Sequence, residues 1–356
     1  MRIGLFTELE TGAPRSRAGV LQALVDNRPH DVTFEHYSTL STFAGLRAVR
    51  EILGRAAADR LDVLHLVTSG PLAVAALILA ARSRLPIILS CEPPAPCASA
   101  VWKSCVRTLA HRSFRVLVAS VAARRAFLRT GVCASKIVDW RPGVETSEFV
   151  PSKRSSALRG RWGASDARPA VIYAGAISSD RGARRLLSME IGLRRTRPMH
   201  QLIVVGDGPC RREVQARCPN AIFTGVIPHA EMPAVLASGD LYVCPSDAVS
   251  TNLAVLEAQA SGLPVVVMEN GSARERVGSS AGVVCRSSAD LIVETAGIVR
   301  TDARRHAMGI AAREYAMRQD WSDGLMAVYA EYRAAAAMSA VRRDLEPAFV
   351  PQSRRL

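Results

Sequence analysis

The sequence predicts an α/β protein made of two Rossmann-like domains that face a cleft, and three observations lead to this fold class. Short apolar segments alternate with helical segments along the chain, in the order typical of doubly wound parallel sheets. The 356 residues exceed what one hydrophobic core usually serves. A turn-rich and then Ser-rich connection separates two such series, so each can form its own sheet.

The first series occupies residues 1–143, which we expect to form the N-terminal domain. Its strands are predicted where short, largely β-branched apolar runs lie between turn signals, at Arg2–Phe6, Val32–Tyr37, Asp62–Val67, Ile87–Ser90, Arg115–Ala119 and Ile137–Trp140. Helical spacing of apolar residues predicts helices at about Gly19–Asn27, Ser41–Ala58, Leu72–Arg82, Ala98–Arg112 and Val121–Arg129. The loop after the first strand lacks G-x-G-x-x-G, which counts against a dinucleotide-binding domain of the dehydrogenase type.

The second series follows a predicted linker, residues 144–168, and occupies residues 169–320. Its strands are expected at Ala170–Ala174, Leu202–Val205, Ala221–Thr224, Asp240–Cys244, Val265–Val267 and Gly282–Cys285. A last helix at 321–343 is expected to pack back towards the N-terminal domain. The tail 344–356, with two prolines and closing arginines, is expected to be disordered.

One unit of the second series indicates where a ligand binds. The strand Asp240–Cys244 ends at Pro245, a polar loop follows, and a helix that contains Glu257 stops at Gly262. In a parallel sheet such a loop and helix start lie at the carboxyl edge, where backbone N–H groups favour an anion. Glu257, about one turn inside the helix, is well placed to accept hydrogen bonds from a ribose diol; the alternative is a solvated helix glutamate.

Composition argues against several classes of protein. The longest apolar run, Leu72–Ala81, is too short to cross a bilayer, and the chain enters its first strand without a secretory leader. The eight cysteines form no C-x-x-C pair, which favours reduced thiols over a zinc site or a disulfide framework. We therefore expect a cytoplasmic protein.

The positive charge is concentrated in the first half. The formal net charge is +14, and residues 1–141 hold 19 Lys and Arg against 10 Asp and Glu. No acidic residue lies between Glu92 and Asp139, and Lys103 and Arg107 begin a basic row beside an apolar helical stripe. Such a helix could hold an anionic membrane surface at the inner face of the membrane, or it could be a solvated face packed on the sheet. Nucleic acid is not expected, because aromatic residues are few and not interleaved with the basic ones.

Four motifs in the second half occur together, in one order and spacing: Leu202–Pro209 with Gly-Asp-Gly-Pro, Asn220–Pro228, Ala237–Ser246 and Leu256–Pro264. On these motifs the chain resembles the GT-B glycosyltransferases of family 4 over nearly its whole length. In the first half, three segments resemble the acceptor-domain strands and the interdomain linker of that family: Asp62–Leu66, Val116–Ser120 and Trp140–Phe149. The branches most similar to it are GDP-mannose-dependent mannosyltransferases and sulfoquinovosyl-diacylglycerol synthases.

The resemblance implies a retaining enzyme without metal or cofactor. It would move a hexose from a nucleoside-diphosphate sugar, such as a GDP- or UDP-hexose, to a hydroxyl of a glycolipid, a lipid-linked acceptor or another glycoconjugate. Arg181 takes the place of the diphosphate-binding lysine of the family, and Glu257 that of the ribose-binding glutamate. The donor-binding positions implied are Gly19, Gly175, Arg181, Gly206, Asp207, Ile227, Val249, Asn252, Leu253 and Glu257.

Three positions depart from the family pattern. Val249 stands where the family has an acid that contacts the donor sugar, with Asp247 two residues out of register, and Ala176 stands where an arginine is usual. Glu92 replaces a frequent active-site histidine and could act as an acid or base, position the acceptor, or have no role. The expected catalytic residues are thus Glu92 and Arg181. The departures leave a second hypothesis, a non-catalytic or divergent paralogue that binds a nucleotide sugar or a partner protein.

Overall fold

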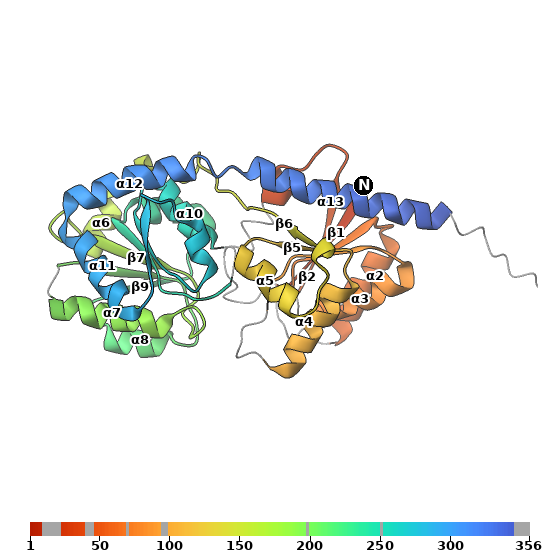
Figure 1. Cartoon of the computed structure of the whole chain (residues 1–356), viewed down its shortest axis with the longest axis horizontal. Coiled ribbons are helices and arrows are strands. Elements are labelled where there is room, and N and C mark those ends of the chain that lie inside the picture. Colours follow the sequence, from red (N-terminus) through yellow and green to blue (C-terminus); the bar gives the residue numbers. More distant parts are fainter. Residues whose placement is uncertain are drawn as a thin grey trace, which may run out of the picture.

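A computed structural model of the chain describes residues 1–8, 23–39, 46–68, 71–93, 99–196, 199–249 and 252–344. The chain forms two six-stranded parallel sheets, one in each half, with helices packed around them (Figure 1). This confirms the predicted fold class, an α/β protein with two Rossmann-like halves.

The first sheet has the strand order β2-β1-β3-β4-β5-β6. Its strands are β1 (Arg2–Glu8), β2 (Thr33–Thr39), β3 (Val63–Leu66), β4 (Ile87–Leu89), β5 (Arg115–Val118) and β6 (Ile137–Asp139). The described helices of this half include α2 (Leu46–Ala58), α3 (Pro71–Ser83), α4 (Ala100–Arg112) and α5 (Val121–Arg129). Strands β3 and β4 are buried throughout, as expected for a sheet covered on both faces. Of the predicted helix Gly19–Asn27, residues 23–26 are helical, whereas residues 19–22, Gly19 among them, lie outside the described residues.

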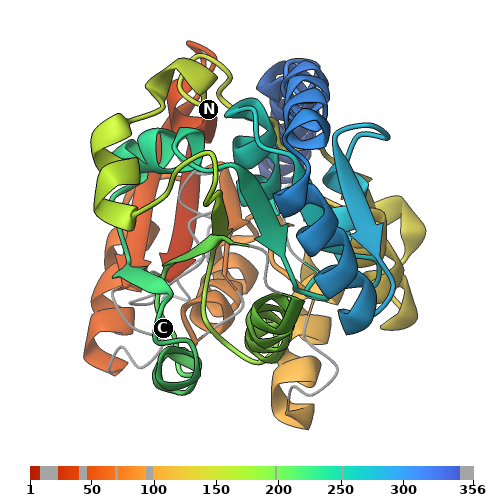
Figure 2. The same cartoon turned by 90° about the vertical axis from the view of Figure 1, so that its left-hand side faces the viewer.

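The second sheet has the order β12-β11-β10-β7-β8-β9. Its strands are β7 (Ala170–Ala174), β8 (Gln201–Val205), β9 (Ile222–Gly225), β10 (Leu241–Cys244), β11 (Val265–Met268) and β12 (Gly282–Cys285). Helices α7 (Ala183–Thr196), α8 (Arg211–Arg217), α9 (Met232–Ala237), α10 (Leu253–Ala260), α11 (Ser288–Arg300) and α12 (Asp302–Ala316) surround it (Figure 2). Strands β8 and β9 follow on one side of β7, and β10 to β12 lie on its other side, so the strand order reverses between β7 and β10. Open α/β sheets bind ligands at such a reversal.

The connection between the sheets contains a helix that the sequence analysis did not predict, α6 (Ser156–Trp162). Ser155 caps its start and Gly163, at φ +63°, ends it. Arg159 in this helix donates to Asp240 at 2.7 Å. Burial raises the pKa of the Asp240 carboxyl, but this bond and one from the Ala170 N–H outweigh it and hold the pKa below its ordinary value. The ion pair fastens α6 to the second sheet.

The last helix, α13 (Trp321–Asp344), returns along the first half of the molecule (Figure 1). The Tyr329 hydroxyl donates to the Leu24 carbonyl at 2.5 Å, which ties α13 to the N-terminal segment. Asp344 is the last residue of this helix, so the predicted disordered tail does not begin there; residues 345–356 lie outside the described part. None of the described helices has the length and apolar character needed to cross a membrane.

Within the described residues, three hydrophobic cores stabilise these layers. One lies within the first half, around Phe6 and Leu66, and one within the second half, around Leu186 and Val243. The third continues from the first sheet through Phe149 and α13 into the second sheet. Because this third core is shared, apolar side chains of the two halves pack against one another.

Candidate functional site

The carboxyl ends of β7, β8 and β10 form one edge of the second sheet, and glycines let their loops touch. A Cβ atom on Gly206 would lie 2.0 Å from the Gly175 carbonyl oxygen. A Cβ atom on Gly182, at φ +85°, would lie 2.2 Å from the Pro245 carbonyl oxygen. Only glycine fits at Gly206 and Gly182 without moving the backbone. The three loops therefore form a continuous edge from which side chains can reach one ligand.

Arg181 projects from this edge to the other half of the molecule. Its Nη2 donates to Glu92 Oε2 at 2.9 Å, and Glu92 follows β4 of the first sheet. The two side chains are 16% and 24% exposed. Burial lowers the pKa of the Arg181 guanidinium, but the charges of Glu92 and Asp180 outweigh it and raise the pKa above its ordinary value. The two residues predicted as catalytic are thus in direct contact.

A second ion pair lies beside the first. Arg185, in the first turn of α7, donates to the Asp247 Oδ2 at 2.5 Å and to the Pro245 carbonyl at 3.3 Å. The other Asp247 oxygen, Oδ1, is buried and has no hydrogen-bond partner in the described part of the chain. Sequence reasoning missed Arg185, which lies in the first turn of α7, whereas Arg181 lies in the turn before this helix.

Val249 does not present a polar group to this edge. Its half-buried side chain packs against the core of the first half of the molecule. An apolar side chain is stabilised at such an interface, whereas a carboxylate there would lose its hydration. The structure thus gives a physical reason for valine where the family resemblance led us to expect an acid.

Helix α10 presents Glu257 from the same edge. Asn252, immediately before the helix, has the left-handed conformation at φ +49°, and its amide donates to Ser272 Oγ at 2.6 Å. Leu253 begins the helix and is buried, whereas Glu257 is half-buried and lines a pocket.

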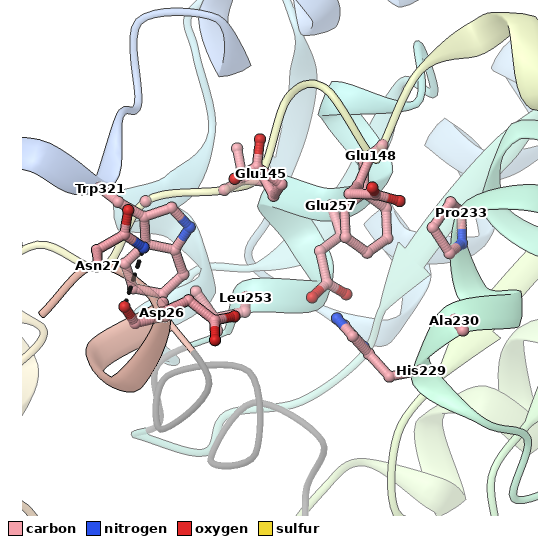
Figure 3. A pocket seen from close by; sticks show the side chains of 14 residues that line it. Asp26, Asn27, Glu145, Glu148, His229, Ala230, Pro233, Leu253, Glu257 and Trp321 are labelled. Atoms are coloured by element: carbon pink, nitrogen blue, oxygen red, sulfur yellow. Dashed lines mark hydrogen bonds between the residues drawn. The ribbon is translucent and has the colours of Figure 1, made fainter. Parts of the chain in front are cut away.

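This pocket has a volume of about 380 Å³ and is lined by both halves of the chain. Figure 3 shows the Glu257 carboxylate and the His229 imidazole pointing towards one another across it. The His229 ring lies 5.7 Å from the ring of Phe149, centroid to centroid. The remaining lining residues are Ala23, Asp26, Asn27, Gly143, Val144, Glu145, Glu148, Ala230, Pro233, Leu253 and Trp321. His229 was not predicted as a site residue, although it lies two positions after the predicted Ile227.

Of the predicted donor-binding positions, Leu253 and Glu257 line this pocket, whereas Ile227 and Asp207 do not. Ile227 is half-buried and packs against the shared core. Asp207 is exposed, and it accepts hydrogen bonds from the Gly208 N–H and from Arg211, both of which lower the pKa of its carboxyl. Among residues 1–8, 23–39, 46–68, 71–93, 99–196, 199–249 and 252–344, no group of three His, Cys, Asp or Glu side chains is arranged to hold a metal ion.

A second contact between the halves lies in the segment after β11. The Glu275 carboxylate accepts hydrogen bonds from the backbone N–H groups of Val121 and Ala122, at 2.7 and 3.1 Å, at the start of α5. Arg276, beside it, is buried and donates to the carbonyls of Ala119 and Pro142; burial lowers the pKa of its guanidinium to about 10. Polar contacts through Arg181, Glu275 and Arg276 thus join the halves.

Family models match both halves of the chain. Residues 5–148 match a model described as Glycosyltransferase Family 4, and residues 168–299 match one described as Glycosyl transferases group 1. The first region covers most of the first sheet, and the second covers the whole second sheet with Arg181 and Glu257.

Several curated proteins are similar in sequence. The GDP-mannose-dependent alpha-mannosyltransferase of Corynebacterium glutamicum is 33% identical over 215 residues, 58% of this chain and 50% of that protein. The protein of the same name from Mycolicibacterium smegmatis is 29% identical over 324 residues, 89% of this chain and 76% of that protein. Sulfoquinovosyl transferase SQD2 of Arabidopsis thaliana is 27% identical over 290 residues, which are 76% of this chain and 56% of that protein. The chain thus spans about half the length of two of these three relatives.

A solved structure shows the same fold. HepE of Anabaena, in complex with UDP-glucose, superposes with a TM-score of 0.76 at 18% sequence identity, over 97% of this chain and 100% of that one. At this identity the likeness concerns the arrangement of both sheets and not the ligand.

Proposed function

Because the chain belongs to the family 4 glycosyltransferases, which have the GT-B fold, we propose that it transfers a hexose from a nucleoside-diphosphate sugar to an acceptor hydroxyl with retention of configuration. The observation that carries this proposal is the position of Arg181 and Glu257. Both project from one carboxyl edge of the second sheet towards the first half of the molecule. That edge is where α/β sheets bind nucleotides.

The two side chains suit opposite ends of such a donor. Cleavage of the bond between sugar and diphosphate leaves growing negative charge on the diphosphate, which a guanidinium stabilises through paired hydrogen bonds. Arg181 would supply this charge from the turn before α7, and Arg185 lies in the first turn of that helix. At the other end, the Glu257 carboxylate would accept hydrogen bonds from the ribose hydroxyls, and the pocket of about 380 Å³ beside it has room for part of the nucleoside.

We propose GDP-mannose as the first donor to test. Two of the relatives described above are named as GDP-mannose-dependent alpha-mannosyltransferases, whereas the UDP-glucose complex shares the fold at low identity. A thermal-shift screen with GDP, UDP and ADP and their sugars tests this choice, because a ligand that binds the folded state raises the unfolding midpoint. We expect GDP and GDP-mannose to give the largest shifts; no shift with any nucleotide would contradict the proposal.

The acceptor side is proposed to dock on an anionic membrane at its cytoplasmic face, where a glycolipid or lipid-linked acceptor is available. Helix α4 buries Val106, Leu109 and Ala110 against the first sheet and exposes Lys103 and Arg107. Val101, near the start of the same helix, has 73% of its surface exposed. A basic helix face with an exposed apolar residue is typical of helices that bind the membrane interface.

A second candidate function, binding of a nucleotide sugar or a partner without catalysis, is favoured by two positions. Val249 packs on the first half where the family has a sugar-binding acid, and Ala176 removes a diphosphate-binding charge. Each lost contact lowers transition-state stabilisation by roughly 1 to 4 kcal/mol. Hydrolysis of GDP-mannose by the purified protein would support the enzyme; donor binding without turnover in the presence of lipid acceptors would support the non-catalytic function.

A further inference from the structure

We propose that Glu92 is a positioning residue for the donor site. Before the donor binds, the Glu92 carboxylate pairs with the Arg181 guanidinium, and the donor diphosphate then displaces it. The inference rests on the proposed function, because it assigns Arg181 to the diphosphate. A donor-binding residue raises the affinity for the donor, whereas Glu92 lowers it, because its contact with Arg181 must break before the diphosphate can bind.

The contact itself has the features of a specific ion pair. A single guanidinium nitrogen of Arg181 lies 2.9 Å from Glu92 Oε2, and the two side chains are 16% and 24% exposed. Charges shielded in this way are less screened by water and salt than an ion pair on the surface. The Glu92 charge also raises the pKa of the Arg181 guanidinium, against the effect of burial.

The pair joins the halves of the molecule at the site. Glu92 follows β4 in the first sheet and Arg181 follows β7 in the second, 89 residues later. Val249, from the loop after β10, packs against the core of the first half. The Glu92 carboxylate thus faces the second sheet at the edge where the donor is proposed to bind.

A carboxylate and a diphosphate compete for the same donors. Both present anionic oxygens that accept paired hydrogen bonds from a guanidinium. A diphosphate offers more charge and more oxygens, so it can replace Glu92 at Arg181.

The test uses Glu92→Gln, which keeps the shape of the side chain and removes its charge. Calorimetric titration of the full chain with GDP should show binding about tenfold tighter than in the parent, because the competing anion is gone. Titration with guanosine, which has no diphosphate, should give the same affinity in both proteins. The same pair of titrations with UDP and uridine covers the other base.

Two variants control for folding and for domain opening. Glu275→Gln removes the same charge from a different contact between the halves, at the Val121 and Ala122 N–H groups, and should leave the affinity for GDP unchanged. Glu92→Asp keeps the charge on a shorter side chain and should give an intermediate affinity. If Glu92→Gln fails to fold, Glu92→Asp alone tests the inference. Tighter binding of GDP than in the parent would support it, and equal or weaker binding would overturn it.

The outcomes separate this inference from the proposed function. If the parent binds neither GDP nor UDP, the proposed function fails, and the inference fails with it. If the parent binds GDP and Glu92→Gln binds it equally or more weakly, Glu92 is not a competitor of the diphosphate and the inference alone is overturned. An equal gain in Glu275→Gln would likewise overturn it, because domain opening would then explain the effect.

Discussion

The hydroxyl of Tyr332, in α13, lies 2.6 Å from Nδ1 of His65, in a central strand of the first sheet. The other ring nitrogen of His65 lies 2.8 Å from the Ser90 hydroxyl. Both rings are buried, and burial lowers the pKa of the imidazole to about 3. The neutral ring therefore has both nitrogens hydrogen-bonded, and α13 is fastened to the sheet that it covers.

Replacing Tyr332 with Phe should destabilise the protein by about 1 to 3 kcal/mol, because one buried nitrogen of His65 loses its partner. Chemical denaturation followed by circular dichroism measures this loss. Tyr315→Phe is the matched control, since no hydrogen bond of the Tyr315 hydroxyl is found within the described residues, and it should change stability by less. An equal loss in both variants would contradict the role of the Tyr332 contact.

The same histidine predicts a dependence of stability on pH. The pKa of His65 is lowered on folding, from about 6.5 in the unfolded chain to about 3. Below the unfolded pKa the unfolded state binds a proton that the folded state does not, so stability falls as the pH drops from about 6.5 towards 3. Paired carboxylates such as Asp240 act in the same direction. We therefore expect His65→Gln, compared with the parent, to show a smaller loss of unfolding midpoint between pH 7 and 5.

Two single substitutions test the proposed donor site, and we expect each of them to weaken the binding of GDP. Glu257→Ala and Arg181→Ala should each weaken binding of GDP by about 1.5 to 3 kcal/mol, because each removes a charged hydrogen-bonding partner. Glu314→Ala, an exposed truncation on α12, should have no effect. Calorimetry on proteins with native circular dichroism spectra provides the measurement. Unchanged affinity in both site variants would rule out this placement of the donor.

The basic face of α4 predicts salt-sensitive binding to vesicles that contain anionic lipid, and none to neutral ones. Each basic residue near an anionic surface contributes roughly 1 kcal/mol, within a Debye length of about 8 Å at physiological salt. Binding in a sedimentation assay should be lost, with GDP affinity unchanged, in a variant with three charge reversals: Lys103→Glu, Arg107→Glu and Arg112→Glu.

A control variant carries the same change of charge on the second half of the molecule, at three exposed arginines: Arg195→Glu, Arg212→Glu and Arg217→Glu. It should keep its binding to anionic vesicles, because the proposed surface is untouched. An equal loss of vesicle binding in both variants would show that the binding depends on net charge and not on the basic face of α4. No binding by the parent would leave the basic row of α4 as a solvated face.

The alternation of strands and helices could be predicted because each element has its own local signal. The strand Ala170–Ala174, for example, was predicted with the bounds that β7 has. Helix α6 was missed because its seven residues carry little periodicity, although Ser155 and Gly163 supply both caps. The contacts between the halves could not be predicted. Nothing in the sequence pairs Glu92 with Arg181, or Glu275 with the start of α5, because these pairings depend on how the two sheets are packed together.

Turnover of the donor tests the central claim most directly. Purified protein is incubated with GDP-mannose and vesicles that contain anionic glycolipid, and release of GDP is followed by phosphorus NMR, with Glu257→Ala as the weakened comparison. The proposed function predicts that GDP accumulates with the parent and much more slowly with the variant, and that mannose is transferred with retention of its α configuration. GDP-mannose that stays intact with the parent, while UDP- and ADP-sugars are also left uncleaved, would contradict it.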